Sequence, residues 1–316
     1  MLNQFGNMFL QIILVLLVAP LLNGIIRKIK AVIQHRKGAP LLQLYFDLIK
    51  LFKKDMVISQ HTSWIFIAAP YVYFITAITA FIFIPVVPQL FSFGFIGDAI
   101  LVVYLLALGR FFLTLSGLDT GSTFGGMGSS REMMISSLIE PSLIITVFTL
   151  GLSSQAGSTA FRAIYEGCGK LGIGVLNPVY LLLLAAMFII ILAETARIPV
   201  DDPSTHLELT MVHEAMILEY SGRYLALMEY GASLKQLIFI TIMANVFLPF
   251  GNTAVPELGL VFPVLIYLAK VIVITVAIAI IEINTVKLRL FSVPNLAALA
   301  FILALLGFMS RFVFGR

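Results

Sequence analysis

Six glutamates stand inside or beside the most apolar stretches of this chain, where a carboxylate is the side chain best able to do chemistry. They are Glu140, Glu194, Glu208, Glu219, Glu229 and Glu282. A carboxylate placed in hydrocarbon costs about 2.5–3.5 kcal/mol on insertion scales, so such residues usually face a protein interior or water. We interpret the set as a route for protons or cations. A position at a helix end, near lipid headgroups, is the alternative for any single member.

The composition defines the elements that must position these carboxylates. Hydrophobic residues make up 60% of the 316 residues and charged residues 11%, whereas a soluble domain usually has about 25% charged residues. A chain inside a bilayer must satisfy its backbone hydrogen bonds internally, and long apolar runs do so as helices. The sequence therefore predicts an all-α, polytopic integral membrane protein, with residues 1–316 forming a single transmembrane domain.

Eight apolar runs are long enough to cross a bilayer as helices, each of which needs about 20 residues. They lie near residues 8–26, 65–88, 97–118, 133–154, 177–195, 234–251, 260–282 and 293–313. The first connection carries eight lysines and arginines between residues 27 and 54, whereas the second and sixth connections carry none. The positive-inside rule then predicts cytoplasmic odd-numbered connections and both termini outside.

Three of the predicted cytoplasmic connections have distinct compositions. Residues 27–62 are basic, and within them apolar side chains from Leu41 to Phe52 recur at helical spacing, which predicts an amphipathic helix on the membrane surface. An ordinary anchoring helix is the alternative there. Residues 116–132 form a Gly-rich loop whose glycines favour close packing and docking, because the lysine and spacing of a phosphate-binding P-loop are absent.

The third connection, residues 194–233, is acidic and too apolar for a disordered tether. Pro199 and Pro203 are expected to end the preceding helix, and a second helix is expected to run from Thr205 or Thr210 to Tyr230. Three of the glutamates, at positions 208, 219 and 229, are 11 and 10 positions apart. These separations are close to whole numbers of helical turns, so the pattern predicts one acidic stripe on that helix.

Several classes of site are excluded by composition. The single cysteine, Cys168, allows no intrachain disulfide and no cysteine cluster for zinc or iron–sulfur. The four histidines lack metal-site spacing, and the basic residues form no nucleic-acid signature. The first apolar run lacks the basic n-region and cleavage site of a signal peptide, so we expect it to be retained. We expect no cofactor or metal bound by this chain, and any redox centre to lie in a partner.

Motifs along nearly the whole chain resemble one family of membrane subunits. They are Gln34-His35-Arg36-Lys37-Gly38-Ala39-Pro40 with Gln43, Asp47 and Lys50; Arg131 with Glu140 nine positions later; Glu194-Thr195-Ala196-Arg197-Ile198-Pro199-Val200-Asp201; Glu208-Leu209; Glu219-Tyr220-Ser221-Gly222; and Glu229-Tyr230. The family is the membrane subunit shared by respiratory complex I, where it is called subunit 1, and the group 4 membrane-bound [NiFe]-hydrogenases, where it is subunit 4 of formate hydrogenlyase. Ala39 interrupts the family's usual Arg-Gly-Pro sequence.

The resemblance implies an acidic funnel that couples a peripheral redox arm to ion-pumping membrane subunits. Together with the intramembrane carboxylates, it suggests a proton or coupling path of Glu140, Glu194, Glu208, Glu219, Glu229, Asp201 and Glu282, and docking or charge-balancing roles for Arg36, Asp47, Lys50, Asp119, Arg131 and Arg197. The implied partners are a [NiFe]-hydrogenase-like large subunit, a small iron–sulfur subunit, a ferredoxin-like subunit and antiporter-like membrane subunits, all in a lipid bilayer and without nucleic acid. The [NiFe] and iron–sulfur centres are expected in those partner subunits.

Two features favour the hydrogenase branch of that family. Between Asp201 and Glu208 the chain lacks the acidic, glycine-containing stretch usual in quinone-reducing relatives, and its Gly117–Ser122, Ser129–Glu132 and Lys287–Leu290 segments resemble the hydrogenases. We therefore expect a non-catalytic anchoring and proton-coupling subunit of a formate-hydrogenlyase-like complex in the inner (cytoplasmic) membrane. The equivalent subunit of a quinone-reducing, complex I-like NADH dehydrogenase and a stand-alone secondary transporter are the alternatives.

Overall fold

The computed structural model describes residues 2–87, 98–153, 157–171, 177–201, 211–249 and 261–314. Within these ranges the chain forms helices and no β-strand, which confirms the predicted all-α fold. The helices are α1 (Leu2–Ile33), α2 (Gln43–Lys53), α3 (Trp64–Phe83), α4 (Ala99–Asp119), α5 (Thr123–Ser153), α6 (Phe161–Leu171), α7 (Pro178–Glu194), α8 (His213–Ile217), α9 (Gly222–Phe247), α10 (Val261–Asn284) and α11 (Val293–Phe314).

Seven of the described helices are long and apolar enough to span a membrane: α1, α3, α4, α5, α9, α10 and the helical stretch that contains α11. The remaining predicted span, the fifth along the chain, corresponds to α7, an apolar helix of 17 residues, which is the lower limit of the usual transmembrane length. All eight predicted apolar runs therefore fold as helices, and the chain is an integral membrane protein.

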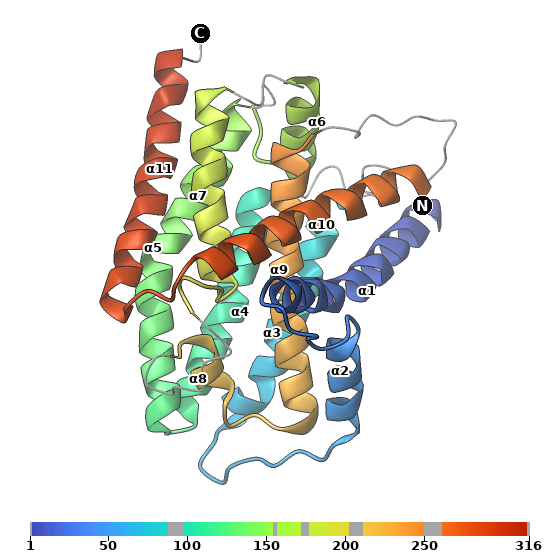
Figure 1. The fold of residues 1–316 in the computed structure, drawn as a ribbon, viewed down its shortest axis with the longest axis vertical. Helices are drawn as coiled ribbons and strands as arrows, with labels where there is room; N and C mark the ends of the chain where they lie inside the picture. The colour runs from blue at the N-terminus through green and yellow to red at the C-terminus, as the bar shows by residue number, and fades with distance from the viewer. Residues whose placement is uncertain are drawn as a thin grey trace.

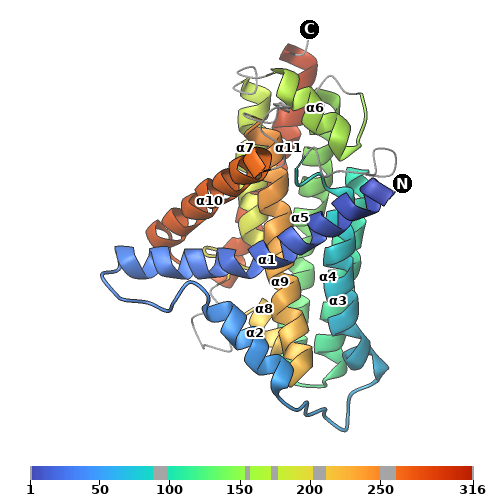
Figure 2. The ribbon, with the colours of Figure 1, turned by 90° about the vertical axis from the view of Figure 1, so that its right-hand side faces the viewer.

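Helix α9 lies in the middle of the fold and packs against α1, α2, α3, α7 and α10 (Figure 1). Its residues from Ser233 to Phe247 are all buried. Helices α3, α4, α5, α7 and α11 run roughly parallel to the long axis of the molecule, whereas α1 and α10 cross it obliquely (Figure 2). The oblique helices bring the end of α1 toward the end of α10, and this approach assembles charged residues that are far apart in the sequence.

Helix α2 confirms the amphipathic helix predicted in the first connection. Its buried residues Leu44 and Leu48 pack against Ala226 of α9, while Phe46 and Ile49 are exposed. The Tyr45 hydroxyl donates a hydrogen bond to the carbonyl oxygen of Leu17 in α1. These contacts attach α2 to both α1 and α9.

The segment 116–132, predicted as a Gly-rich loop, is helical apart from the turn at residues 120–122. Helix α5 begins at Thr123, and the Ser122 hydroxyl accepts a hydrogen bond from the Gly125 N–H at 3.1 Å. A Cβ atom on Gly125 would lie 2.4 Å from the Gly117 carbonyl oxygen. The glycines therefore allow α4 and α5 to approach closely, as the sequence predicted. Residues 123–132 are helical where a loop was predicted, because the apolar run that placed the fourth span begins only near residue 133.

The helix predicted from Thr205 or Thr210 to Tyr230 is interrupted in the structure. Helix α8 ends at Ile217, a turn follows, and α9 begins at Gly222, whose φ is +52°. A Cβ atom on Gly222 would lie 2.5 Å from the Asp55 carbonyl oxygen. The interruption lets the loop before α3 pack against the start of α9, and it destroys the predicted stripe of three aligned glutamates.

Candidate functional site

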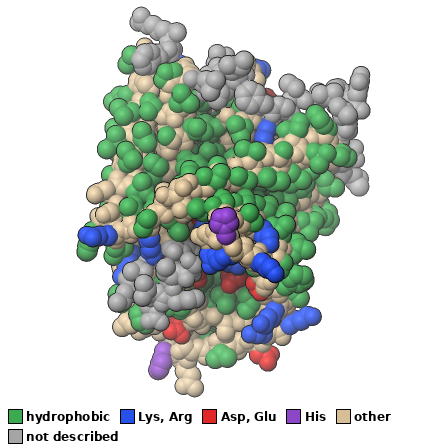
Figure 3. Space-filling model, in the orientation of Figure 1, with side chains coloured by type: hydrophobic (Ala, Val, Ile, Leu, Met, Phe, Trp, Pro, Cys, Tyr) green, Lys and Arg blue, Asp and Glu red, His purple; other side chains and the backbone are tan. Residues whose placement is uncertain are grey.

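Charged side chains gather over the lower part of one face of the molecule, below a broad hydrophobic surface (Figure 3). Beneath that surface the helices enclose two groups of polar residues. One is an ion cluster between α4, α5, α7 and α9, and the other is a polar pocket where α1, α8 and α9 meet the segment after α7. Both groups consist of charged or polar side chains, which are rarely buried within a membrane unless they pair with one another or line a cavity.

The ion cluster consists of Arg110, Glu132, Glu140, Glu194 and Lys235. Arg110 of α4 contacts all three carboxylates: its Nη1 lies 2.6 Å from Glu140 Oε1, its Nε lies 3.5 Å from Glu132 Oε1, and its Nη2 donates to Glu194 Oε2. Lys235 of α9 approaches the same Glu194 oxygen at 2.9 Å. Arg110 therefore links two carboxylates of α5 to the carboxylate that ends α7.

Exposure differs across the ion cluster. The side chains of Arg110 and Glu194 are 5% and 2% exposed, whereas that of Glu140 is 35% exposed. Arg110 and Glu140 also line a cavity of about 340 Å³ beside α4 and α5, together with Tyr104, Ala107, Leu108, Phe111 and Met133. We call this the α4–α5 cavity. Glu140 is thus the carboxylate at which the cluster meets the outside of the chain.

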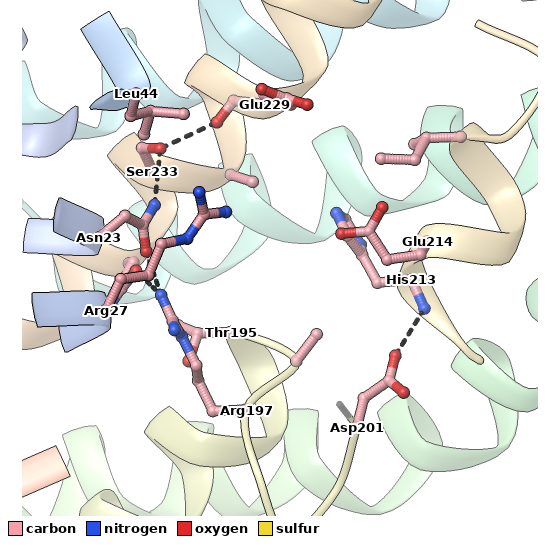
Figure 4. A pocket seen from close by; sticks show the side chains of 14 residues that line it. Asn23, Arg27, Leu44, Thr195, Arg197, Asp201, His213, Glu214, Glu229 and Ser233 are labelled. Atoms are coloured by element: carbon pink, nitrogen blue, oxygen red, sulfur yellow. Dashed lines mark hydrogen bonds between the residues drawn. The ribbon is translucent and has the colours of Figure 1, made fainter. Parts of the chain in front are cut away.

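The polar pocket is a second cavity, of about 140 Å³. Its lining includes Asn23, Arg27, Arg197, Asp201, His213, Glu214, Glu229, Ser233 and Gln236. The Arg27 side chain extends into the space between Arg197 on one side and His213 and Glu214 on the other, with Glu229 facing the same opening (Figure 4). The pocket therefore has basic and acidic side chains on facing walls.

Hydrogen bonds fix the basic wall of the polar pocket. Arg197 donates to Gln236 Oε1 at 2.8 Å and to Asn23 Oδ1, and Asn23 Nδ2 donates to Ser233 Oγ at 3.0 Å. Ser233 Oγ in turn donates to the Glu229 carbonyl oxygen at 2.9 Å. The chain of contacts ties α1 to α9 and holds the Arg197 guanidinium in one orientation.

The titratable groups of the pocket outside the spans are perturbed mainly by burial. Burial lowers the pKa of His213 below its usual value, which favours the neutral imidazole. Burial raises the pKa of Glu214, and the nearby carboxylate of Glu229 raises it further, against the opposing effect of His213. Burial also lowers the pKa of Arg197. Burial therefore favours the protonated, neutral form of the Glu214 carboxyl group.

Asp201 connects the polar pocket to the rest of the fold. Its Oδ2 accepts hydrogen bonds from the backbone N–H groups of Val212 at 3.0 Å and His213 at 3.2 Å. Its Oδ1 lies 3.0 Å from Lys287 Nζ, in the segment between α10 and α11. Asp201 is 1% exposed, so this buried carboxylate caps α8 and fixes it beside the pocket.

Glu282 belongs to a separate contact at the end of α10. Its side chain is fully buried, forms an ion pair with Lys30 of α1, and lies 3.6 Å from Arg197 Nη1. Glu282 therefore supports the basic wall of the polar pocket from behind. Its ion-pair neighbours within the described part of the chain are Lys30 and Arg197, and neither belongs to the ion cluster.

The structure brings some sequence-predicted residues together and separates others. Glu140 and Glu194 meet in the ion cluster, and Glu229, Asp201 and Arg197 line the polar pocket. Glu219 is exposed in the turn after α8, and Glu208 lies outside the described residues. Glu219 is separated from the other carboxylates because the helix that would have aligned it is broken at Gly222.

The predicted docking residues also divide into two groups. Arg36 and Lys50 are exposed on the α1–α2 segment, where Asp47 accepts a hydrogen bond from Gln43 at 2.9 Å. Asp119 instead accepts from the Ser63 N–H at 2.8 Å, and Arg131 donates to the Met211 carbonyl oxygen at 2.9 Å. The last two residues therefore make contacts within the chain, whereas Arg36 and Lys50 present exposed side chains.

Sequence reasoning missed the cations of the ion cluster. Arg110 lies within the predicted third span, and Lys235 lies one position inside the predicted sixth span. The criterion that selected the glutamates, a charge inside an apolar run, applies equally to both residues. Glu132 was noted only within the Ser129–Glu132 segment that resembles the hydrogenases, because it precedes the apolar run that begins near residue 133.

Comparisons with known proteins agree along almost the whole chain. The family model described as NADH dehydrogenase matches residues 6–311. Formate hydrogenlyase subunit 4 of Escherichia coli (strain K12) is 34% identical over 302 residues, covering 95% of this chain and 96% of that protein. Hydrogenase-4 component C of the same organism is 35% identical over 302 residues, covering 95% and 93%.

Two further comparisons extend the likeness beyond hydrogenases. NADH-quinone oxidoreductase subunit 8 of Rhodothermus marinus is 30% identical over 264 residues, covering 78% of this chain and 73% of that protein. A chain in the solved structure of the membrane-bound sulfane sulfur reductase, an archaeal respiratory membrane complex, superposes with a TM-score of 0.85 at 22% identity. That superposition covers 97% of this chain and 99% of the other, and it establishes the same fold.

Proposed function

This chain belongs to the family that the NADH dehydrogenase model describes, and from that premise we propose that it anchors and couples a group 4 membrane-bound [NiFe]-hydrogenase complex of the formate hydrogenlyase type. The relatives named after such complexes match 95% of the chain, whereas the Rhodothermus marinus relative matches 78%. This difference in coverage favours the hydrogenase type over a quinone-reducing complex.

One observation carries the coupling role: charged and polar side chains follow one another from the polar pocket to the α4–α5 cavity. Glu229, Gln236 and His213 line the pocket. Lys235 of α9 interacts electrostatically with His213 and contacts Glu194 at 2.9 Å. Arg110 then joins Glu194 to Glu140 beside the cavity. Buried charges at membrane depth are costly and typical of ion pathways, so this arrangement supports proton coupling.

The chain carries out no bond-making step in this proposal. Redox turnover in partner subunits changes the charge or packing at the polar pocket, where Glu214 and Glu229 face Arg27. The change alters the protonation of Glu194 and Glu140. The altered charge of Glu140 then acts, across the cavity beside it, on an antiporter-like neighbour. The physical content of the proposal is a shift between two states of one buried charge network.

The exposed part of the α1–α2 segment is the proposed docking surface for the peripheral subunits. Arg36 and Lys50 are exposed there, next to exposed apolar residues such as Phe46 and Ile49. A basic and apolar surface suits either a membrane headgroup layer or a protein partner. We propose that this segment is cytoplasmic and meets the large, small iron–sulfur and ferredoxin-like subunits, with both termini on the opposite side of the inner membrane.

Purification of the native complex in mild detergent tests the proposal. We expect co-purification with a [NiFe] subunit and iron–sulfur subunits, together with hydrogen evolution. Quinone reduction without hydrogen evolution would replace the hydrogenase type with the NADH dehydrogenase type. A chain that purifies alone and transports ions in vesicles would overturn both and support a secondary transporter.

The coupling role needs a second experiment. In inverted membrane vesicles, Glu194→Gln is expected to lose proton transport while hydrogen evolution with a soluble dye persists. The matched control is Glu166→Gln on α6, an exposed glutamate paired with Arg162. Equal proton transport in Glu194→Gln and in the unaltered complex would contradict the coupling role.

A further inference from the structure

Helix α11 forms an apolar outer surface at the edge of the molecule. Among the seven described helices that are long enough to span a membrane, the stretch that contains α11 is the least buried. It packs against α5 and α7, and it lies beside α5, with both helices ending on the same side (Figure 1). Its exposed side chains include Leu305, Leu306, Met309 and Phe312. In an integral membrane protein such a surface contacts either lipid or another protein.

A groove lies on this surface between the two helices. Its volume is about 190 Å³, and it is lined by Ile144, Ile145 and Phe148 of α5 and by Leu305 and Phe308 of α11. We call this the α5–α11 groove. The ring centroids of Phe148 and Phe308 are 6.3 Å apart. Because every lining side chain is apolar, the groove suits a hydrocarbon chain and would not satisfy a polar group.

The α5–α11 groove leads toward the ends of its two helices. Arg311 follows Phe308 by three residues on α11, and Leu152 follows Phe148 by four residues on α5. These spacings place helical residues side by side on one face. At 1.5 Å per residue, Arg311 lies about 4.5 Å beyond Phe308 along the axis of α11. A cationic side chain therefore stands next to one end of the apolar groove.

Arg311 spans the ends of both helices. Its guanidinium donates a hydrogen bond to the carbonyl oxygen of Leu152 at 3.3 Å, within the last turn of α5, where carbonyl groups have no acceptor role inside the helix. The side chain is partly exposed. A guanidinium is always charged and carries five N–H donors in a planar arrangement that matches phosphate. Near the end of a transmembrane helix, an arginine side chain reaches the headgroup layer.

The position of this arginine is unusual for its side of the membrane. The proposed orientation places the end of α11 outside, where lysine and arginine are under-represented. Arg162 of α6, which the same orientation places outside, pairs with Glu166 at 2.8 Å, whereas Arg311 contacts a carbonyl oxygen. An anionic ligand at the membrane surface would account for a cation at this position. Neither the groove nor the location of Arg311 depends on that orientation.

We propose that the α5–α11 groove holds one acyl chain of an anionic phospholipid whose phosphate is bound by Arg311. The lipid has both required parts, because its hydrocarbon chain fits the apolar lining and its phosphate is complementary to the guanidinium. A transmembrane helix of a neighbouring subunit would have to place side chains in the groove and also a carboxylate opposite Arg311. The charge next to the groove therefore favours the phospholipid.

Photolabelling of the native complex in vesicles tests this site. The probe is phosphatidylglycerol with a diazirine on one acyl chain, at low mole fraction in phosphatidylcholine vesicles. We expect it to label α5 near Phe148 and α11 near Phe308. Unlabelled phosphatidylglycerol should reduce the labelling, whereas added phosphatidylcholine with the same chains should not. Equal competition by the two lipids would show that the headgroup is not recognised and would overturn the proposal.

Arg311→Gln tests the phosphate contact. It removes the charge and keeps an N–H donor for the Leu152 carbonyl oxygen, so we expect about fivefold less labelling, the effect of one cation near an anionic membrane surface. The matched control is Arg162→Gln, since Arg162 is an exposed arginine paired with Glu166 on α6. Labelling of Arg311→Gln at the level of the unaltered complex would contradict the site.

A second pair of variants tests the groove if Arg311→Gln does not assemble. Leu305→Trp places a larger side chain in the groove and should abolish the labelling of α5, whereas Leu306→Trp should not, because Leu306 is exposed and does not line the groove. Equal labelling of these two variants would overturn the proposal. A photoreactive residue in place of Phe148 that crosslinks to another subunit instead of to lipid would assign the groove to a partner helix and also overturn it. These measurements follow lipid binding, so their outcome is independent of whether the complex evolves hydrogen.

Discussion

Replacement of Asp201 distinguishes a structural tether from a member of a proton path. The carboxylate is 1% exposed and joins the segment after α7 to α8 and to the α10–α11 segment. Loss of a helix cap costs about 1 kcal/mol, and removal of one partner of a buried ion pair costs about 3–5 kcal/mol. Because the Lys287 side chain is 20% exposed, we expect a total near 3–4 kcal/mol for Asp201→Ala.

Hydrogen exchange measures this loss where it occurs. A change of about 3 kcal/mol in local opening corresponds to about a 100-fold faster exchange, and we expect it in the segment around α8. Asp201→Asn keeps an oxygen for the N–H groups of Val212 and His213 and loses the charge opposite Lys287. We therefore expect about half of the effect. Lys287→Met is the matched control, because it removes the ion pair and leaves the cap of α8 intact.

The outcome that would refute this reasoning is unchanged exchange around α8 in Asp201→Ala. If the same variant also lost proton transport, Asp201 would belong to the coupling path predicted from the sequence instead of to the support of α8. Transport and exchange that decline together in Asp201→Ala, with a milder decline of both in Asp201→Asn, would agree with the tether.

Three further predictions follow from single contacts. Burial lowers the pKa of His213 in the folded state. The stability that neutral His213 contributes is therefore complete above the ordinary pKa near 6.5 and is lost as the pH falls toward the lowered pKa. His213→Asn should flatten the acid side of a plot of thermal midpoint against pH. Gly222→Ala should lower the thermal midpoint, since φ is +52° and the new Cβ would lie 2.5 Å from a carbonyl oxygen. The backbone strain alone is about 1–2 kcal/mol. The control Gly126→Ala should have little effect, because Gly126 has open space around it. Glu219→Gln should retain far more proton transport in vesicles than Glu194→Gln, because Glu219 is exposed while the Glu194 side chain is 2% exposed; equal losses would contradict the assignment of the path to buried residues.

The membrane class and the helical spans were determined by the sequence alone. Each span depends on a local run of about 20 apolar residues, and such a run can be recognised without knowing what packs against it. The glutamates could be selected for the same reason, since a charge within an apolar run is a local property. Local patterns also predicted α2, whose apolar positions recur at the helical period.

The partners of those glutamates were decided only by tertiary structure. Arg110 and Glu194 are 84 positions apart, and they meet because α4, α5, α7 and α9 pack around one another. The break at Gly222 likewise depends on the carbonyl oxygen of Asp55, which approaches from a distant loop. Hydropathy and spacing describe one helix at a time, whereas the net charge of the ion cluster is a property of four helices. For that reason the sequence identified acidic residues, and the fold determined which of them are balanced by a cation.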